Sequence, residues 1–329
     1  MKVEGVYIAA AASVLPTRIS RAADAVGAGI LDPRDLALCP AESVRIAETP
    51  CWEMGLAACT EVLEAGEHHA ADVSLVVYTA AVFAEEHPWS PAHRIARMLG
   101  ADRATALEIA QMSNGGAAAV AHAAAQLMLE PGMTHAIAIS SADFTALPFP
   151  RWSMAPGVIY GDGAAAALLS VEPGPLALRA VATTGDPTLE ASFPAGHPFK
   201  APDPHRRTDM GVLSNASAIR TAVRTAVDRC LDEAALDPGD PRIVAVYPTR
   251  LGRLVYRHCV QPALPEPLRH REVLLGENTG HLGAGDMLAN LAHIFSADAL
   301  PSGAVALLVT TGAGFTASCL AVENIAPAR

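Results

Sequence analysis

Residues 106–129 constrain the fold of this chain more than any other stretch of its sequence. A short apolar run at 106–109 is followed by a polar turn and then by an alanine-rich segment that extends to about Leu129. This order predicts a strand, a sharp turn and a long helix. Ser113 lies in the turn, where the free N–H groups of a helix N-terminus favour developing negative charge. The stretch alone is compatible with Ser113 as a helix cap or as a nucleophile.

The alternation of strand and helix continues along the chain and predicts an α/β fold. Mostly parallel sheets covered by helices are typical of such a pattern. Residues 11–50 show no clear element. Elsewhere we expect strands at 2–10, 72–79, 106–109, 134–141, 164–171, 176–184, 242–246, 271–275, 303–309 and 315–322, and helices at 51–65, 91–99, 215–235, 251–260 and 286–295, besides the alanine-rich helix.

A Pro-Gly-Pro sequence at 173–175 marks a break near the middle of the chain. The same order of strand, helix, strand, turn and strand is seen on both sides of this break, without a close sequence repeat. We therefore expect two similar halves, residues 1–172 and 173–329.

Composition and charge exclude several classes of protein. The 329 residues are 51% hydrophobic and 17% charged, and the formal net charge is -11. This negative charge argues against a nucleic-acid partner. No apolar run reaches the roughly 18–20 residues of a membrane span. No basic N-terminal segment precedes an apolar run, so the sequence predicts a cytoplasmic protein that does not bind membranes.

The cysteines and histidines are scattered. Six cysteines occur without a CxxC pair or a zinc-ligand spacing, which is typical of free thiols in a reducing compartment. The histidines at 87, 93, 258 and 293 show no ligand spacing either. The sequence therefore predicts no metal and no cofactor.

Four short motifs stand out along the chain. They are the candidate nucleophile turn at 110–116, the strand sequence HAIAISSADF at 135–144, the GDGA turn at 161–164 and the glycine turn GAGFT at 312–316. Together they resemble the thiolase superfamily, specifically the β-ketoacyl-acyl-carrier-protein synthase III branch, over residues 2–323. The resemblance implies a thiolase fold with a five-layered α-β-α-β-α arrangement and a homodimer. It places the nucleophile in the first half, and the catalytic histidine and oxyanion glycine turn in the second.

The sequence departs from this branch at three positions that carry its chemistry. The branch has a cysteine nucleophile where this chain has Ser113, and a histidine where this chain has Thr249. The catalytic asparagine of the branch corresponds to His281, in the turn at 280–286. A second register through the sequence NT at 278–279 is also open. We prefer the first register because it gives the following helix, and the interval to Gly312, the same positions relative to this turn as in the branch.

The substituted residues are suited to moving an acyl group. A serine hydroxyl is a weak nucleophile that needs an adjacent base, and the imidazole of His281 can take and return its proton. Asp286 can fix the tautomer of that imidazole. The three residues would then act as nucleophile, base and orienting acid. The N–H groups of Ser113 and Gly314 would form the oxyanion hole, in which one donor is typically worth about 3 kcal/mol of barrier.

These substitutions predict an acyltransferase that forms no carbon–carbon bond. Condensing relatives use a His and Asn pair to stabilise a carbanion, and Thr249 and His281 do not reproduce that pair. A minority of the branch, in antibiotic and other natural-product pathways, carries a GHxGxxD-like turn and acts as acyltransferases. The sequence GHLGAGD at 280–286 matches this turn at every fixed position. Two alternatives stay open: a starter-unit-selecting enzyme of a polyketide pathway, and a non-catalytic thiolase-fold partner subunit.

The resemblance also indicates the substrates. The acyl donor is a thioester on an acyl carrier protein or polyketide synthase, or on CoA, and its phosphopantetheine is substrate rather than cofactor. The tryptophan clamp of CoA-using relatives has no counterpart in residues 30–40, which favours a carrier protein. Residues 83–90 and 185–211 are expected to wall the pocket. The polar character of the second stretch suits an amino-sugar or cyclitol acceptor, and a second carrier protein is also open.

Five further residues are candidates for substrate contact. Arg151, next to Trp152, resembles a family arginine near the tunnel mouth that meets phosphate, with a solvated loop arginine as the alternative. His197 is either a pocket residue or a surface-loop histidine, which is favoured. Asn278 is either a contact or a turn residue, and the turn is favoured. Thr249 completes this set because it stands where the branch has its catalytic histidine.

Overall fold

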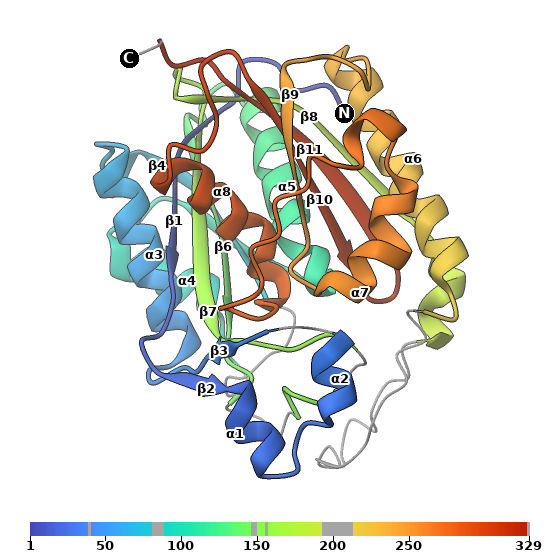
Figure 1. Ribbon diagram of the computed structural model, residues 1–329. Coiled ribbons are helices and arrows are strands. Elements are labelled where there is room, and N and C mark those ends of the chain that lie inside the picture. Colours follow the sequence, from blue (N-terminus) through green and yellow to red (C-terminus); the bar gives the residue numbers. More distant parts are fainter. Residues whose placement is uncertain (39–40, 81–88, 146–149, 155–156, 193–212, 328–329) are drawn as a thin grey trace.

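The computed structural model describes residues 1–38, 41–80, 89–145, 150–154, 157–192 and 213–327 (Figure 1). Within these residues, one sheet has the strand order β5-β4-β6-β7-β1-β8-β11-β10-β9. Its strands are β1 (Tyr7–Val14), β4 (Val73–Thr79), β5 (Thr105–Ile109), β6 (His135–Ala142), β7 (Gly163–Ser170), β8 (Leu176–Gly185), β9 (Ile243–Pro248), β10 (Val305–Gly312) and β11 (Thr316–Asn324). Strands β4, β5 and β6 are parallel to one another, as are β9 and β10, and the other pairs are antiparallel.

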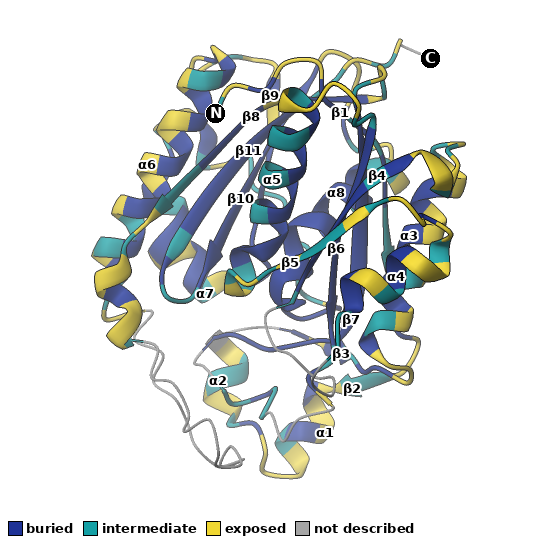
Figure 2. Ribbon diagram, turned by 180° about the vertical axis from the view of Figure 1, so that it is seen from behind, coloured by how far each residue is buried: buried dark blue, intermediate teal, exposed yellow. Residues whose placement is uncertain are grey.

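The helices cover the sheet on several sides (Figure 1). They are α3 (Cys51–Ala65), α4 (Pro91–Leu99), α5 (Gly115–Leu129), α6 (Ala216–Ala234), α7 (Arg253–Val255) and α8 (Asp286–Ser296). In Figure 2, α3, α4 and α6 carry exposed residues on one side, whereas the strands are mostly buried. Among the described residues, no helix combines the length and apolar character that crossing a membrane requires.

Side-chain alternation along the strands produces the layers of the molecule, because successive residues of a strand point to opposite faces. In β6, Ala136 and Ala138 pack into a central cluster, whereas Ile137 packs against α3 and α4. In β10, Leu308 faces the same central cluster, and Leu307 joins the cluster around α6. Three clusters thus separate five layers: α3 and α4, one half of the sheet, α5 and α8, the other half, and α6. This is the expected α-β-α-β-α arrangement.

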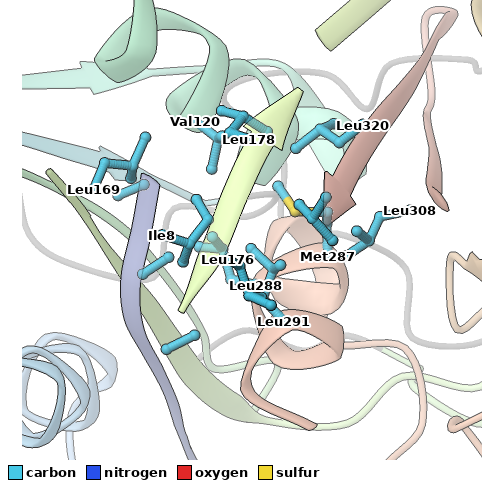
Figure 3. Packing of buried hydrophobic residues seen from close by; sticks show 14 of the residues in the cluster. Ile8, Val120, Leu169, Leu176, Leu178, Met287, Leu288, Leu291, Leu308 and Leu320 are labelled. Atoms are coloured by element: carbon cyan, nitrogen blue, oxygen red, sulfur yellow. The ribbon is translucent and has the colours of Figure 1, made fainter. Parts of the chain in front are cut away.

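The central layer is narrow because the facing ends of α5 and α8 carry small residues. A Cβ added at Gly116 would lie 2.6 Å from the carbonyl oxygen of Ala284, which is closer than any real contact of that kind. Glycine therefore lets the start of α5 touch the turn that leads into α8. Further along, larger side chains fill the space between these helices and the strands, as Figure 3 shows for Val120, Met287 and Leu288.

Most expected elements are present, and helices 51–65 and 91–99 coincide with α3 and α4. One expected strand is wrong and another has other bounds. The strand expected at 2–10 begins at Tyr7 and continues to Val14, and Lys2 forms only an isolated bridge. Residues 271–275 are not a strand, because only Glu272 pairs with β9 before the chain turns away to line a cavity. The helix expected at 251–260 is present as α7 followed by a wider π-helical turn.

A small unit, for which the sequence gives no clear signal, covers one end of the sheet (Figure 1). It contains β2 (Ile19–Arg21), β3 (Ser43–Arg45), α1 (Ala22–Gly27) and α2 (Pro33–Leu38). Its elements are too short to show a helical or strand period in the sequence. They are held by a shared apolar cluster in which Leu31 and Val44 pack with Trp152 and Ile159.

Candidate active site

Ser113 lies in a single 3-10 turn, Met112–Asn114, between β5 and α5. The residue before it, Met112, has a φ of 48° and a side chain that is 46% exposed. A positive φ in a residue other than glycine is uncommon and is often found at functional sites. Ser113 itself is half-buried. The turn therefore places a serine hydroxyl at the start of a buried helix, at the edge where the parallel strands β4, β5 and β6 end.

A chain of two hydrogen bonds joins Ser113, His281 and Asp286. Oγ of Ser113 lies 2.8 Å from Nε2 of His281. Nδ1 of the same imidazole lies 2.6 Å from Oδ2 of Asp286. A carboxylate can only accept, so Nδ1 carries the proton and Nε2 presents a lone pair to the serine hydroxyl. This is the hydrogen-bond order of a nucleophile, a base and an orienting acid.

The carboxylate of Asp286 is fixed by further donors. Its Oδ1 accepts the backbone N–H of Leu282 at 2.8 Å, and its Oδ2 accepts the backbone N–H of Arg250 at 2.7 Å. Asp286 is 0% exposed and His281 is 1% exposed. A buried carboxylate is costly unless hydrogen bonds satisfy it, and here both oxygens are satisfied. The orientation of His281 is therefore set by groups that water does not reach.

The turn at 280–286 brings His281 to this position through close backbone contacts. The N–H of His281 donates to the carbonyl of Ile159 at 2.7 Å, and Gly161 donates to the carbonyl of His281 at 3.0 Å. Gly280 has a φ of +72°, and a Cβ there would lie 2.8 Å from the nitrogen of Gly161. Only glycine satisfies both demands. The ring of Tyr160 lies against His281 with centroids 5.3 Å apart.

The glycine turn at 312–316, expected to supply an oxyanion donor, lies next to the Ser113 turn. Oγ1 of Thr310 donates to the carbonyl of Ser113 at 3.4 Å, and a Cβ on Gly312 would lie 2.8 Å from the nitrogen of Asn114. Gly314 is half-buried and has open space on its Cβ side. The turn that carries Gly314 is thus placed beside the serine, and its role as a donor stays a prediction.

Arg250 is a residue of this site that the sequence does not single out. Its guanidinium is buried, donating from Nε to Asn290 at 2.9 Å and from Nη1 to Thr279 at 3.2 Å. Burial lowers the pKa of Arg250, while the negative charge of Asp286 opposes that shift. The cation therefore helps to balance the buried carboxylate. The Arg250 partners Asn290 and Thr279 lie in distant segments, so no local sequence signal marks its burial.

Arg151 and Trp152 are part of the framework around the site. The guanidinium of Arg151 forms an ion pair with Asp162 at 3.1 Å, and their side chains are 11% and 0% exposed. Asp162 also accepts the backbone N–H groups of Ala47 and Phe144. Trp152 is buried and donates its indole N–H to Ser20 at 3.1 Å. Both residues are engaged in packing and internal hydrogen bonds, so we do not propose them as substrate contacts.

The remaining candidates are placed differently. Thr249 is buried, and its hydroxyl accepts the N–H of Thr311 at 3.0 Å and donates to the carbonyl of Val309 at 3.4 Å. It also lines a narrow cavity of about 30 Å³ together with Arg250. Asn278 is exposed in a turn. His197 lies outside the described residues, as do most of the stretches expected to wall the pocket.

Comparison with solved structures finds similar folds over nearly the whole chain. The acyltransferase ChlB3 superposes with a TM-score of 0.87 at 27% identity, covering 98% of each chain. FabH, the 3-oxoacyl-(acyl carrier protein) synthase III from Pseudomonas aeruginosa PAO1, has a TM-score of 0.80 at 20% identity, over 97% of this chain and 98% of that one. A priming β-ketosynthase from a polyketide pathway has a TM-score of 0.79 at 22% identity, over 99% and 98%. Neither a protein-family profile nor a curated protein sequence matches this chain.

These similarities agree with the motifs and with the layer order of the structure. The last two comparisons, at 20% and 22% identity, establish the fold alone. The comparison at 27% identity adds a likeness in sequence to an acyltransferase of the same fold. The chain therefore has the thiolase fold and resembles ketosynthase III structures in its architecture.

Proposed function

We propose that this protein is an acyltransferase of natural-product biosynthesis that uses Ser113 as its nucleophile and forms no carbon–carbon bond. The observation that carries the proposal is the hydrogen bond of 2.8 Å between Oγ of Ser113 and Nε2 of His281. The fixed contact between His281 and Asp286 supports it, and so does the similarity to an acyltransferase.

In the first half-reaction, Ser113 attacks the carbonyl carbon of an acyl thioester. Nε2 of His281 takes the hydroxyl proton as the new C–O bond forms, and the negative charge gathers on the carbonyl oxygen. Backbone N–H groups at the start of α5 and in the glycine turn would stabilise that oxygen. The C–S bond then breaks, and His281 returns the proton to the departing thiolate. The products are acyl-Ser113 and a free thiol.

The second half-reaction reverses these roles. A hydroxyl, amine or thiol of the acceptor enters after the thiol product leaves, and Nε2 of His281 removes its proton. The acceptor attacks the ester carbonyl, the bond to Oγ breaks, and the proton returns to Ser113. Asp286 stabilises the imidazolium in both halves without itself taking the proton.

Decarboxylative condensation needs donors aimed at the oxygen of a malonyl thioester. The hydroxyl of Thr249 is already engaged with the backbone of β10. His281 presents an acceptor to Ser113 because its N–H faces Asp286. Neither group is therefore arranged to donate to a developing enolate, which supports transfer over condensation.

The donor that we propose is an acyl carrier protein or polyketide synthase, with acyl-CoA as the second source of the same pantetheine thioester. The acceptor that we propose is a polar small molecule such as an amino-sugar or cyclitol, or a second carrier protein. We further propose that the protein acts as a homodimer, as the family resemblance implies.

Intact-mass spectrometry tests the proposal directly. The protein is incubated with a panel of acyl-carrier and acyl-CoA thioesters, and the expected result is one acyl adduct per chain. Ser113→Ala should form none. Ser302→Ala, which removes an exposed serine hydroxyl far from the turn, is the matched control and should be acylated as the wild type is.

Two outcomes would overturn the proposal. No adduct with any thioester of a broad panel would favour a non-catalytic partner subunit. Release of carbon dioxide and a β-keto product on adding malonyl-carrier protein would favour a condensing, starter-unit enzyme. Transfer of the acyl group to an added hydroxyl, amine or thiol acceptor, with no loss of carbon dioxide, is the result that the proposal requires.

A further inference from the structure

Three side chains with metal-ligating atoms meet far from Ser113. His68 follows the end of α3, His135 is the first residue of β6, and Glu172 follows the end of β7. Their ligand atoms all lie within 4.8 Å of one another, and no other such group occurs among the described residues. Because β6 runs from His135 towards the edge where β4 and β5 also end, this cluster lies at the opposite edge of the sheet from the serine turn.

His135 is prepared as a ligand. Its side chain is buried, at 5% exposure, and its Nδ1 lies 2.9 Å from the hydroxyl oxygen of Thr134. Its Nε2 has no hydrogen-bond partner within the described part of the chain, although it is fully buried. A buried polar atom without a partner is costly and calls for an explanation. With the Nδ1 proton directed at Thr134, the lone pair of Nε2 is free to bind a cation.

The other two groups converge on the same place. The rings of His68 and His135 have centroids 4.5 Å apart and are tilted by 56°, so they do not stack face to face. Glu172 is exposed, and its backbone N–H donates to Oγ of Ser170 at 2.9 Å, which ties the residue to the end of β7. An open groove next to His68 is also lined by Glu64 and Glu67, which gives a cation a negatively charged approach.

We propose that His68, His135 and Glu172 bind a divalent cation of the zinc class. Two imidazole nitrogens and one carboxylate are a donor set that suits Zn²⁺ and leaves a fourth position for water. Bonds of about 2.0–2.2 Å between Zn²⁺ and its ligands require the three ligand atoms to lie closer to one another than 4.8 Å. The half-buried His68 and the exposed Glu172 can supply this adjustment by small side-chain rotations, while His135 stays in place.

Such an ion would join the end of α3 to the start of β6 and the end of β7. These three segments belong to the outer helical layer and to the sheet that it covers. A ligand that binds only the folded state stabilises that state by mass action, so Zn²⁺ should raise the temperature of unfolding. The site is separate from the proposed acyl transfer, and the failure of one proposal leaves the other unchanged.

The test is Zn²⁺ binding to chelator-treated full-length protein, measured by isothermal titration calorimetry and checked with Co²⁺ absorption. The wild type should bind one ion per chain with ligand-field bands typical of four-coordinate Co²⁺. His68→Ala and Glu172→Gln should each weaken Zn²⁺ affinity at least about 10-fold, since removing even a group that only orients a ligand costs about 10–100-fold. Thr134→Val should fall in that same range. His69→Ala, an exposed neighbour of His68, is the matched control and should bind as the wild type does.

The proposal is overturned if the wild type binds no stoichiometric Zn²⁺. It is also overturned if binding survives in both His68→Ala and Glu172→Gln, which would place the ion elsewhere on the chain. Circular dichroism of each variant, recorded without metal, confirms that any loss of binding does not come from unfolding.

Discussion

Oδ2 of Asp286 lies 2.6 Å from Nδ1 of His281, and both side chains are almost completely buried. This contact fixes which nitrogen of the imidazole carries the proton. Asp286→Asn should therefore lower the rate of Ser113 acylation by about 10⁴-fold, because an amide can stabilise the wrong tautomer. Burst kinetics by quenched-flow mass spectrometry measures the rate. The exposed Asp298→Asn is the control, and an Asp286→Asn rate within 10-fold of wild type would remove Asp286 from the proposed mechanism.

Arg250 should matter far more for stability than the nearby Arg253. Arg250→Met leaves Oδ1 of Asn290 without its donor and should cost at least about 1–3 kcal/mol of unfolding free energy. Arg253 forms an exposed ion pair with Glu277, so Arg253→Met should change stability by no more than about 1 kcal/mol. Urea denaturation of the two variants compares them directly. Equal losses would contradict the structural role given to Arg250.

Gly280 is constrained by both conformation and space. Gly280→Ala should destabilise the protein by clearly more than the about 1–2 kcal/mol that a left-handed conformation alone costs, because the added Cβ meets backbone atoms of Ile159 and Gly161. Gly303 has a similar φ of +77° and no atom within 4 Å of an added Cβ. Gly303→Ala thus measures the free-energy cost of the left-handed conformation without a steric clash. The comparison fails if the two variants unfold at the same denaturant concentration.

The ion pair between Arg151 and Asp162 gives a test of the tunnel-mouth role that the sequence suggests for Arg151. Arg151→Met leaves a fully buried carboxylate without its cation and should cost about 3–5 kcal/mol of stability. A residue that only contacted phosphate would instead raise KM for the thioester and leave the unfolding midpoint unchanged. Thermal unfolding and steady-state kinetics on the same variant separate the two roles.

Much of the fold follows from local patterns in the sequence. Helices α3 and α4 have clear ends: Pro50 lies immediately before α3, Pro91 is the first residue of α4, and Gly100 ends α4 in a left-handed cap. The buried strands β6 and β7 are rich in small and apolar residues. The segment at 271–275 also contains apolar residues but pairs with β9 only at Glu272, and Leu274 and Leu275 line a cavity instead. Composition alone does not show how far such a pairing extends.

The residues of the site also differ in whether the sequence reveals them. His281 and Asp286 are close in sequence and share one turn, and Ser113 occupies a strand–turn–helix junction, so all three could be named from the sequence. Their catalytic role stays a prediction. The burial of Arg250 depends on Asn290 and other residues from distant segments, which no local pattern reveals.

Ser113 and Asp286 each lie at the N-terminal end of one of the two central helices, and most residues of each helix are buried in the core. In the proposed mechanism the reaction type therefore depends on a few residues at the helix ends, whereas the rest of each helix serves the scaffold. Relative to the condensing branch that its motifs resemble, the expected differences at Ser113 and His281 lie at such ends. For protein engineering, libraries should vary the side chains at these helix ends and keep the glycines of the turns, such as Gly280 and Gly312, because a Cβ there would meet backbone atoms.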